Sequence, residues 1–309
     1  MNDIYFEFKS IENIFRDIDE YKNLLNNIDY HFNFFTDMYF CINNFMSAPT
    51  SFKNISNAVS VGDKITLETI EKYFDNINQS TVLDLSVLLN NCKKILYSLR
   101  KCVEVVNISD AITLFRKFKD DLLLYIYFVR LGSIIESDYE TEEKLIYWNN
   151  CVNDVLRWRN NEMKKVYYTK IINFLKKDSL LVELNNRTGC FNYIKNLTDQ
   201  LNNFAHSNGI SFINNYNPIY NQGKMIKLLE FINIHLEKVS GYLLAMLFTI
   251  SPNYLASTDY IGYMDAGAEP PDGCQYWIAP FYQEYIDKKL YAINPILKQF
   301  LIENTPMKI

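Results

Sequence analysis

The chain has 309 residues, of which 49% are hydrophobic and 22% charged, with only 9 glycines and 8 prolines. This apolar content excludes wholesale disorder, and so few turn-forming residues argue against a large β-sandwich or barrel. The net charge of −5 is too small for the whole molecule to attract a polyanion, so any such function requires a local basic patch.

In the first half of the chain, apolar residues recur at steps of three and four, which predicts amphipathic helices. Ser80 suits the N-cap of one of them, and the segment 47–62, which contains Pro49, is expected to be a loop. The segments that follow the helical pattern are residues 10–28, 30–46, 66–77, 80–102 and 109–132.

The polar residues 136–143 mark a predicted boundary between two helical lobes, residues 1–138 and 139–309. The predicted fold class is therefore all-α, a multi-helix bundle of two lobes. In the second lobe, residues 257–273 contain several glycines and two adjacent prolines, which predicts an irregular loop.

The remaining elements of the second lobe are also predicted to be helical. Thr188 is expected to begin a helix that ends at His206, and Pro252 to stop a longer one. The predicted segments are residues 141–175 with a break near 160–161, then 188–206 and 224–250, and two short helices entered by Pro280 and by Asn294 with Pro295.

Features of targeting and of cofactor binding are missing from the sequence. The six cysteines are scattered without a CxxC pair, so neither a disulfide framework nor a metal or other cofactor is expected. Charged residues interrupt the first 15 positions, where a signal peptide needs an apolar run. The most apolar stretches, 122–129 and 242–250, are far shorter than the ~20 residues of a membrane span, so we expect a cytoplasmic protein.

The end of the 188–206 helix carries the best candidate for acid–base chemistry. His206 follows Asn202 by four residues and is surrounded by amide and hydroxyl side chains up to Gly209. A histidine in such a setting titrates near neutral pH and can transfer protons. His31 lies in an aromatic run and His235 inside the predicted 224–250 helix, and each is expected to be a packed or surface residue and not a catalyst.

This string resembles the motif of HEPN-type helical proteins, many of which are ribonucleases in bacterial toxin and antiviral (phage) defence systems. Asn202 and His206 match the polar residue and the histidine of that motif. The resemblance implies metal-independent RNA cleavage, with His206 assisting proton transfer and Asn202 orienting a phosphate or the imidazole. It also implies a dimer, because composite sites in that family lie across subunit interfaces.

The motif's arginine is absent from this chain. Leu201 occupies its commonest place. Because this arginine would hold the scissile phosphate, another cation would have to replace it, and Arg187, Arg157 and Arg159 are the candidates in sequence. The alternative interpretation is that His206 hydrogen-bonds the last carbonyls of its helix, where the helix dipole favours a positive group.

A second feature is a basic stretch over residues 157–177. Its candidate nucleic-acid-binding residues are Arg157, Arg159, Lys164, Lys165 and Lys170, and Trp158, Tyr167 and Tyr168 are interleaved with them. Such a stretch suits a phosphate backbone with stacked bases. The alternative is a solvated helix face whose aromatic rings point into the core.

The tail loop leaves a choice between a cation site and a protein contact. Asp259, Asp265, Glu269 and Asp272 carry oxygen ligands, but their spacing does not match an EF-hand. Packing or docking of a partner through this loop is the preferred interpretation. Two functions therefore remain from the sequence: a HEPN-like ribonuclease or degenerate relative, and a non-catalytic helical scaffold that binds protein or nucleic acid.

Overall fold

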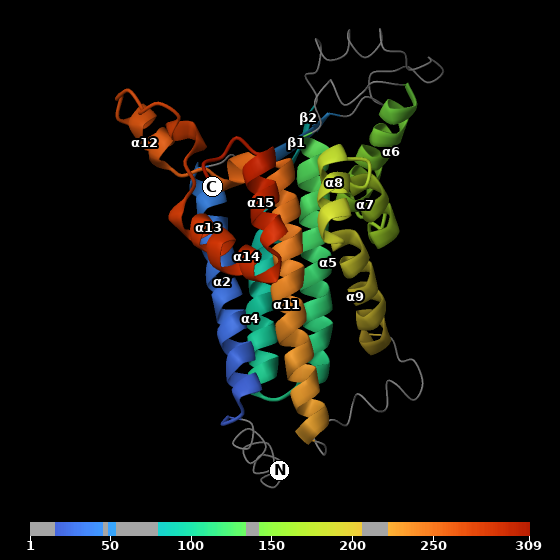
Figure 1. Cartoon of the computed structure of the whole chain (residues 1–309). Helices are drawn as coiled ribbons and strands as arrows, with labels where there is room; N and C mark the ends of the chain where they lie inside the picture. The colour runs from blue at the N-terminus through green and yellow to red at the C-terminus, as the bar shows by residue number, and fades with distance from the viewer. Residues whose placement is uncertain (1–15, 46–48, 54–79, 134–141, 206–221) are drawn as a thin grey trace.

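The computed structural model describes residues 16–45, 49–53, 80–133, 142–205 and 222–309 (Figure 1). Within these ranges the chain is almost entirely helical, which confirms the all-α prediction, and none of the described helices has the length and apolar character to cross a membrane. The predicted helix over 66–77, the start of the predicted helix over 10–28 and most of the predicted lobe boundary lie outside the described residues.

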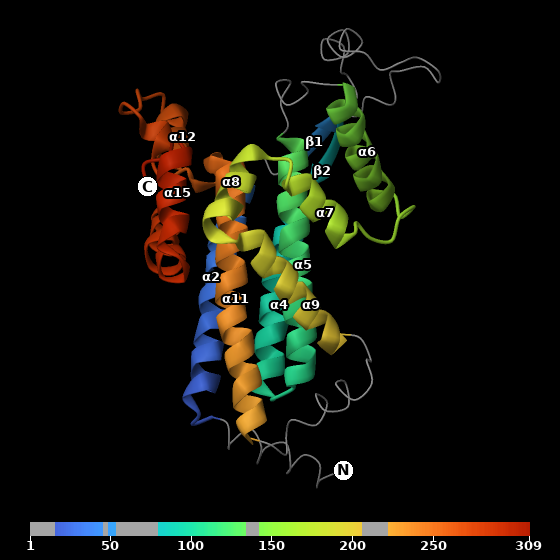
Figure 2. The same cartoon turned by 45° about the vertical axis from the view of Figure 1, so that its right-hand side comes forward.

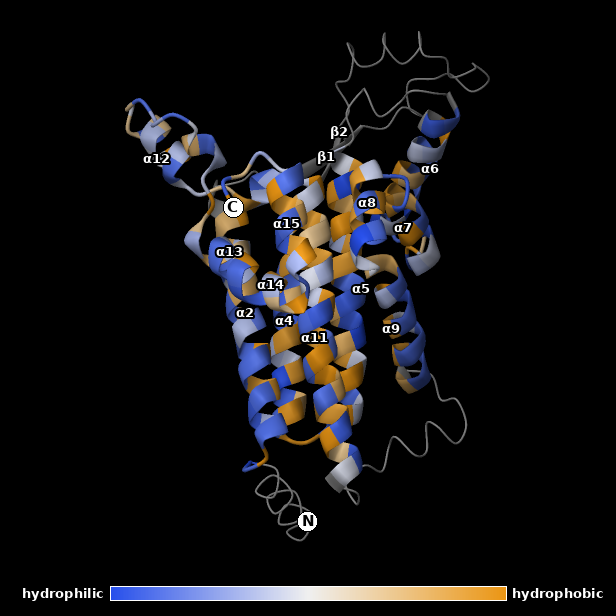
Figure 3. Ribbon diagram, viewed as in Figure 1, coloured by the Kyte–Doolittle hydropathy of each residue, from blue (hydrophilic) through white to orange (hydrophobic). Residues whose placement is uncertain are grey.

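Four long helices form the central bundle, α2 (Asp19–Phe45), α4 (Ser86–Glu104), α5 (Ile108–Gly132) and α11 (Gln222–Ile250). α2, α5 and α11 run in one direction and α4 runs in the other (Figures 1 and 2). Each presents an apolar stripe to a common core, so hydrophobic residues gather on the inner sides of the bundle (Figure 3). α11 lies between α2 and α5, so helices from both predicted lobes contribute to one hydrophobic core.

Three predictions in the first half of the chain were wrong: a break in α2, a loop over residues 47–62 and a helix start at Ser80. α2 continues without a break through residue 29, where two helices were expected; neither Gly nor Pro interrupts it, and the Asn27 amide donates to Asn233 Oδ1 of α11 (2.9 Å). Residues around Ser80 form strand β2 (Ser80–Asp84), which pairs antiparallel with β1 (Pro49–Lys53), inside the expected loop. α4 begins only at Ser86, whose backbone N–H donates to Asp84 Oδ1.

A second layer of shorter helices packs on α5 and α11: α6 (Glu142–Arg159), α7 (Tyr168–Leu175), α8 (Ser179–Thr188) and α9 (Cys190–Ala205). The predicted break after α6 is confirmed, since Asn161 has a φ of 61° that a helix cannot hold. The predicted helix start at Thr188 was wrong, because Gly189 (φ 70°) ends α8 in the left-handed conformation and α9 begins at Cys190.

The C-terminal segment contains several short helical elements. The predicted helix starts at Pro280 and at Asn294 with Pro295 are confirmed, and Asn294 Oδ1 accepts from the Ile296 N–H at 3.0 Å. The expectation of no helix within residues 257–273 was wrong, since α12 lies there. The elements are η4 (Pro252–Leu255), α12 (Asp259–Asp265), η5 (Cys274–Tyr276), α13 (Pro280–Tyr285), the π-helical turn η6 (Ile286–Leu290), α14 (Tyr291–Ile293) and α15 (Pro295–Asn304).

Candidate functional site

Of the two predicted catalytic residues, the structure describes only Asn202. His206 lies outside the described residues, whereas Asn202 occupies the last full turn of α9 and is half-buried. Its Oδ1 atom is buried and accepts no hydrogen bond among the described residues. An unpaired buried amide oxygen is costly, although other buried polar atoms of the described residues, such as Asn149 Oδ1, also have no hydrogen bond.

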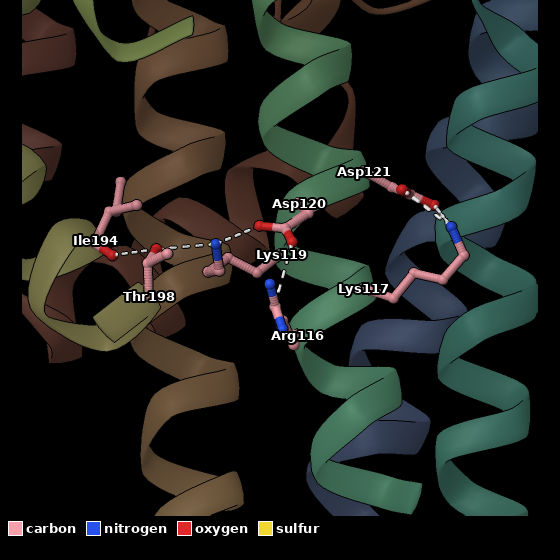
Figure 4. Close-up of polar contacts among 7 residues, drawn as sticks. All are labelled: Arg116, Lys117, Lys119, Asp120, Asp121, Ile194 and Thr198. Atoms are coloured by element: carbon pink, nitrogen blue, oxygen red, sulfur yellow. Dashed lines mark hydrogen bonds and ion pairs between the residues drawn. The ribbon is translucent and has the colours of Figure 1, made fainter. Parts of the chain in front are cut away.

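A buried ammonium group lies where α5 packs against α9. Lys119 of α5 is fully buried, and its Nζ donates to Thr198 Oγ1 of α9 (3.0 Å) and to the Asp120 carboxylate (Figure 4). Thr198 in turn donates to the Ile194 carbonyl (2.7 Å). Thr198 and Asn202 are one helical turn apart, so they share a face, and the ammonium lies against that face.

Aromatic and charged neighbours complete this polar cluster. The Tyr168 ring, at the start of α7, has its centroid 5.3 Å from Lys119 Nζ, and Arg116 lies 3.8 Å from Asp120. Burial lowers the pKa of Lys119, although Asp120 opposes the shift. Burial also raises the pKa of Tyr168 to about 12. The cluster is therefore a desolvated cation with a carboxylate, a hydroxyl and a ring around it.

Sequence reasoning missed Lys119. The signal was present, because Lys119 stands between Phe118 and Leu122 in an otherwise apolar stripe of α5, where a solvated lysine would not be placed. A charged residue at an inward position is rare unless it has a partner. Its partner Thr198 is 79 positions away, which local patterns do not show.

The predicted basic stretch forms a surface at the end of α6 and in the loop that leads to α7. We call Arg157, Arg159, Lys164 and Lys165 the basic surface; all four are exposed, and none makes an ion pair among the described residues. Lys170 differs, because it is half-buried and paired with Asp154. A hollow of about 530 Å³ opens within the basic surface, and its lining consists of Trp158, Arg159, Asn161, Met163 and Lys164.

The aromatic residues of the stretch divide between surface and interior. Tyr167 is 60% exposed, and Lys165 Nζ lies 5.0 Å from its ring centroid. Trp158 is half-buried against Phe128, with centroids 5.3 Å apart. Tyr168, the next residue after Tyr167, contacts Lys119 instead. Tyr167 and Tyr168 thus connect the basic surface to the buried cluster on α9.

The other predicted candidates are engaged elsewhere. Arg187 donates to Glu303 of α15 (2.5 Å), and the hydrogen bond raises its pKa. His31 is fully buried, and burial lowers its pKa to about 3. The His235 ring shares a 2.6 Å hydrogen bond with the Tyr193 hydroxyl, and burial lowers its pKa as well. His31 is thus packed in the core, and His235 is half-buried.

A second hollow, of about 300 Å³, lies between α2 and α11 and was not indicated by the sequence. Its character is neutral and polar, with the ion pair between Glu237 and Lys289 (2.9 Å) at its edge. The lining consists of Asn23, Asn26, Asn27, Tyr30, Asn233, Glu237 and Lys289. Glu237 neutralises Lys289 here, so this hollow presents no free charge for an anion.

Comparisons with protein-family models, with curated proteins and with solved structures gave no match for this chain. The likeness to HEPN-type proteins therefore remains a prediction from the motif around Asn202 and His206.

Proposed function

We propose that this protein binds single-stranded RNA through the basic surface, as a HEPN-like helical protein of the kind that acts in bacterial defence systems. The observation that carries the proposal is the group of four exposed cations without acidic partners among the described residues, two of which, Arg159 and Lys164, line a hollow. Exposed cations follow a phosphate backbone, and an exposed ring such as Tyr167 stacks on bases without sequence preference.

The acidic total of the protein does not oppose this proposal. The net charge of −5 is spread over the whole molecule, whereas the segment 157–165 holds four cations against one acid, Glu162. At physiological salt, charges separated by more than about 8 Å are largely screened, so a strand on this surface responds mainly to the local cations.

Anisotropy of a labelled single-stranded RNA, titrated at several salt concentrations, tests the proposal. The Arg159→Gln/Lys164→Gln protein should bind roughly tenfold more weakly, and its log Kd against log salt should lose a slope of about 1.4, at about 0.7 per lost phosphate contact. The matched control is Lys288→Gln/Lys298→Gln, which removes the same charge from exposed or half-buried ion pairs of the C-terminal helices. Equal weakening in both proteins, or no binding by the wild type, would refute the proposal.

Metal-independent RNA cleavage is a second candidate, favoured by the unpaired Asn202 oxygen on the same α9 face as the Lys119–Thr198 contact. Lys119 does not replace the missing motif arginine, because its ammonium is fully buried and bonded to Thr198 and Asp120. In this candidate, His206 transfers the proton and Asn202 orients the phosphate or the imidazole.

Incubation with RNA in the presence of a chelator tests cleavage. His206→Ala should lower the rate by a factor of about 10² or more, the usual worth of a general acid or base. His235→Gln removes a histidine that is held by Tyr193 and should leave the rate unchanged. Absence of cleavage by the wild type, with RNA binding retained, would leave a binding scaffold as the function.

A further inference from the structure

Residues 258–273 form a projection that we call the acidic arm. Its base is closed by an antiparallel bridge between Ala256 and Ile278, with the Ser257 N–H bonded to the Trp277 carbonyl at 2.7 Å. From this base the arm, which includes α12, extends away from the bundle in both views (Figures 1 and 2). The bridge therefore presents the arm in a fixed direction.

The arm is folded although it has no core of its own. None of the α12 residues is buried, and the exposed fractions of Tyr260, Tyr263 and Met264 are 37%, 36% and 56%. These three side chains follow one another at spacings of three and four, so they share one face of the short helix. An ordered helix with exposed aromatic residues on one face is typical of a protein contact.

The charge of the arm has one sign. It contains Asp259, Asp265, Glu269 and Asp272 and no lysine or arginine. At its base a cation approaches, since Lys308 Nζ lies near Gly273. An acidic surface with exposed Tyr and Met is complementary to a basic surface whose hollow is partly lined by apolar side chains, and charge complementarity selects partners and orients them.

The basic surface has these complementary properties. Its cations Arg159 and Lys164 border the hollow, and Trp158 and Met163 provide apolar lining. Within one chain the two surfaces cannot meet, because α12 and α6 lie on opposite sides of the bundle in both views (Figures 1 and 2).

We propose that the acidic arm of one copy docks on the basic surface of a second copy, with Tyr263 and Met264 toward the hollow and the arm's carboxylates beside Arg159 and Lys164. The contact joins two different patches, so a pair of copies still has one free arm and one free basic surface, and association continues into rings or chains. If the RNA-binding proposal holds, the arm also competes with RNA, because both occupy the same cations.

Sedimentation velocity over a range of protein concentrations tests the contact. The wild type should self-associate at 50 mM salt and do so at least tenfold more weakly at 500 mM, because exposed charges are screened. Two variants each neutralise the charges of one contacting surface. Asp265→Asn/Glu269→Gln changes the arm, and Arg159→Gln/Lys164→Gln changes the basic surface. Each should be monomeric alone. Lys288→Gln/Lys298→Gln should associate as the wild type does.

A mixture of the two variants gives the decisive result. The arm variant keeps its basic surface and the other keeps its arm, so together they should form a 1:1 dimer and nothing larger. A monomeric wild type at every concentration, association that survives in either variant, or a mixture that stays monomeric would overturn the proposal. The arm variant keeps the basic surface and should therefore bind RNA at least as tightly as the wild type. Its RNA affinity thus tests the RNA-binding proposal separately from the contact between copies.

Discussion

Lys119 and His31 are both fully buried ionisable side chains, and they meet the cost of burial differently. Lys119 has oxygen partners in Thr198 and Asp120, which partly compensate its charge. His31 has no hydrogen bond at either ring nitrogen among the described residues. Burial, with Lys289 adding to it, lowers the His31 pKa to about 3. His31 is therefore neutral in the folded protein at ordinary pH.

We expect His31→Leu to reduce the loss of stability in acid. Unfolded histidine has a pKa of 6.5 and folded His31 about 3, so between these values the unfolded chain binds more protons and stability falls as pH falls. From pH 7.5 to 5.0 this group alone removes about 2 kcal/mol. Urea unfolding at both pH values should show a decrease smaller by that amount in His31→Leu. An equal decrease would mean that His31 protonates without unfolding.

At the scale of the elements, one glycine lies where two helices approach each other closely. Gly241 is buried in α11, and a Cβ atom placed there would collide with Ile293 Cδ1 of α14. Alanine favours a helix by about 1 kcal/mol over glycine, but at this position the contact opposes that gain.

A double-mutant cycle separates the two effects. In an Ile293→Val background, which removes Cδ1, Gly241→Ala should stabilise the protein by about 1 kcal/mol. In the wild-type background the same change should stabilise less or destabilise. Free energies of unfolding from urea titrations measure both. Equal effects in the two backgrounds would show that Ile293 moves aside without cost.

At the scale of the whole molecule, the fold consists of a shared core and a projecting acidic arm. Replacing residues 260–272 by three glycines should leave the thermal midpoint within about 2 °C of the wild type, because α12 buries no residue and the bridge between Ala256 and Ile278 is kept. Thermal unfolding followed by circular dichroism measures this. A large decrease would mean that the arm contributes to the core.

The sequence predicts features that depend on neighbouring residues better than features that depend on residues far apart in the chain. The helical class, the break at Asn160 and Asn161 and the helix starts at Pro280 and Pro295 were predictable, because periodicity and caps depend on residues within a few positions. The strand at Ser80 was not, since its partner β1 lies on the far side of a long intervening segment. For the candidate site, the motif around Asn202 and the exposed cations were visible in the sequence.

By itself, then, the sequence determined an all-helical protein with a basic stretch, an acidic tail segment and one suggestive motif. Only the tertiary structure decided that Lys119 lies against Thr198, that Lys170 is paired with Asp154, and that α11 joins α2 and α5 in one core. The physical reason is distance along the chain. Asn27 and Asn233 are 206 positions apart, and burial and pairing between such residues arise only when the helices pack.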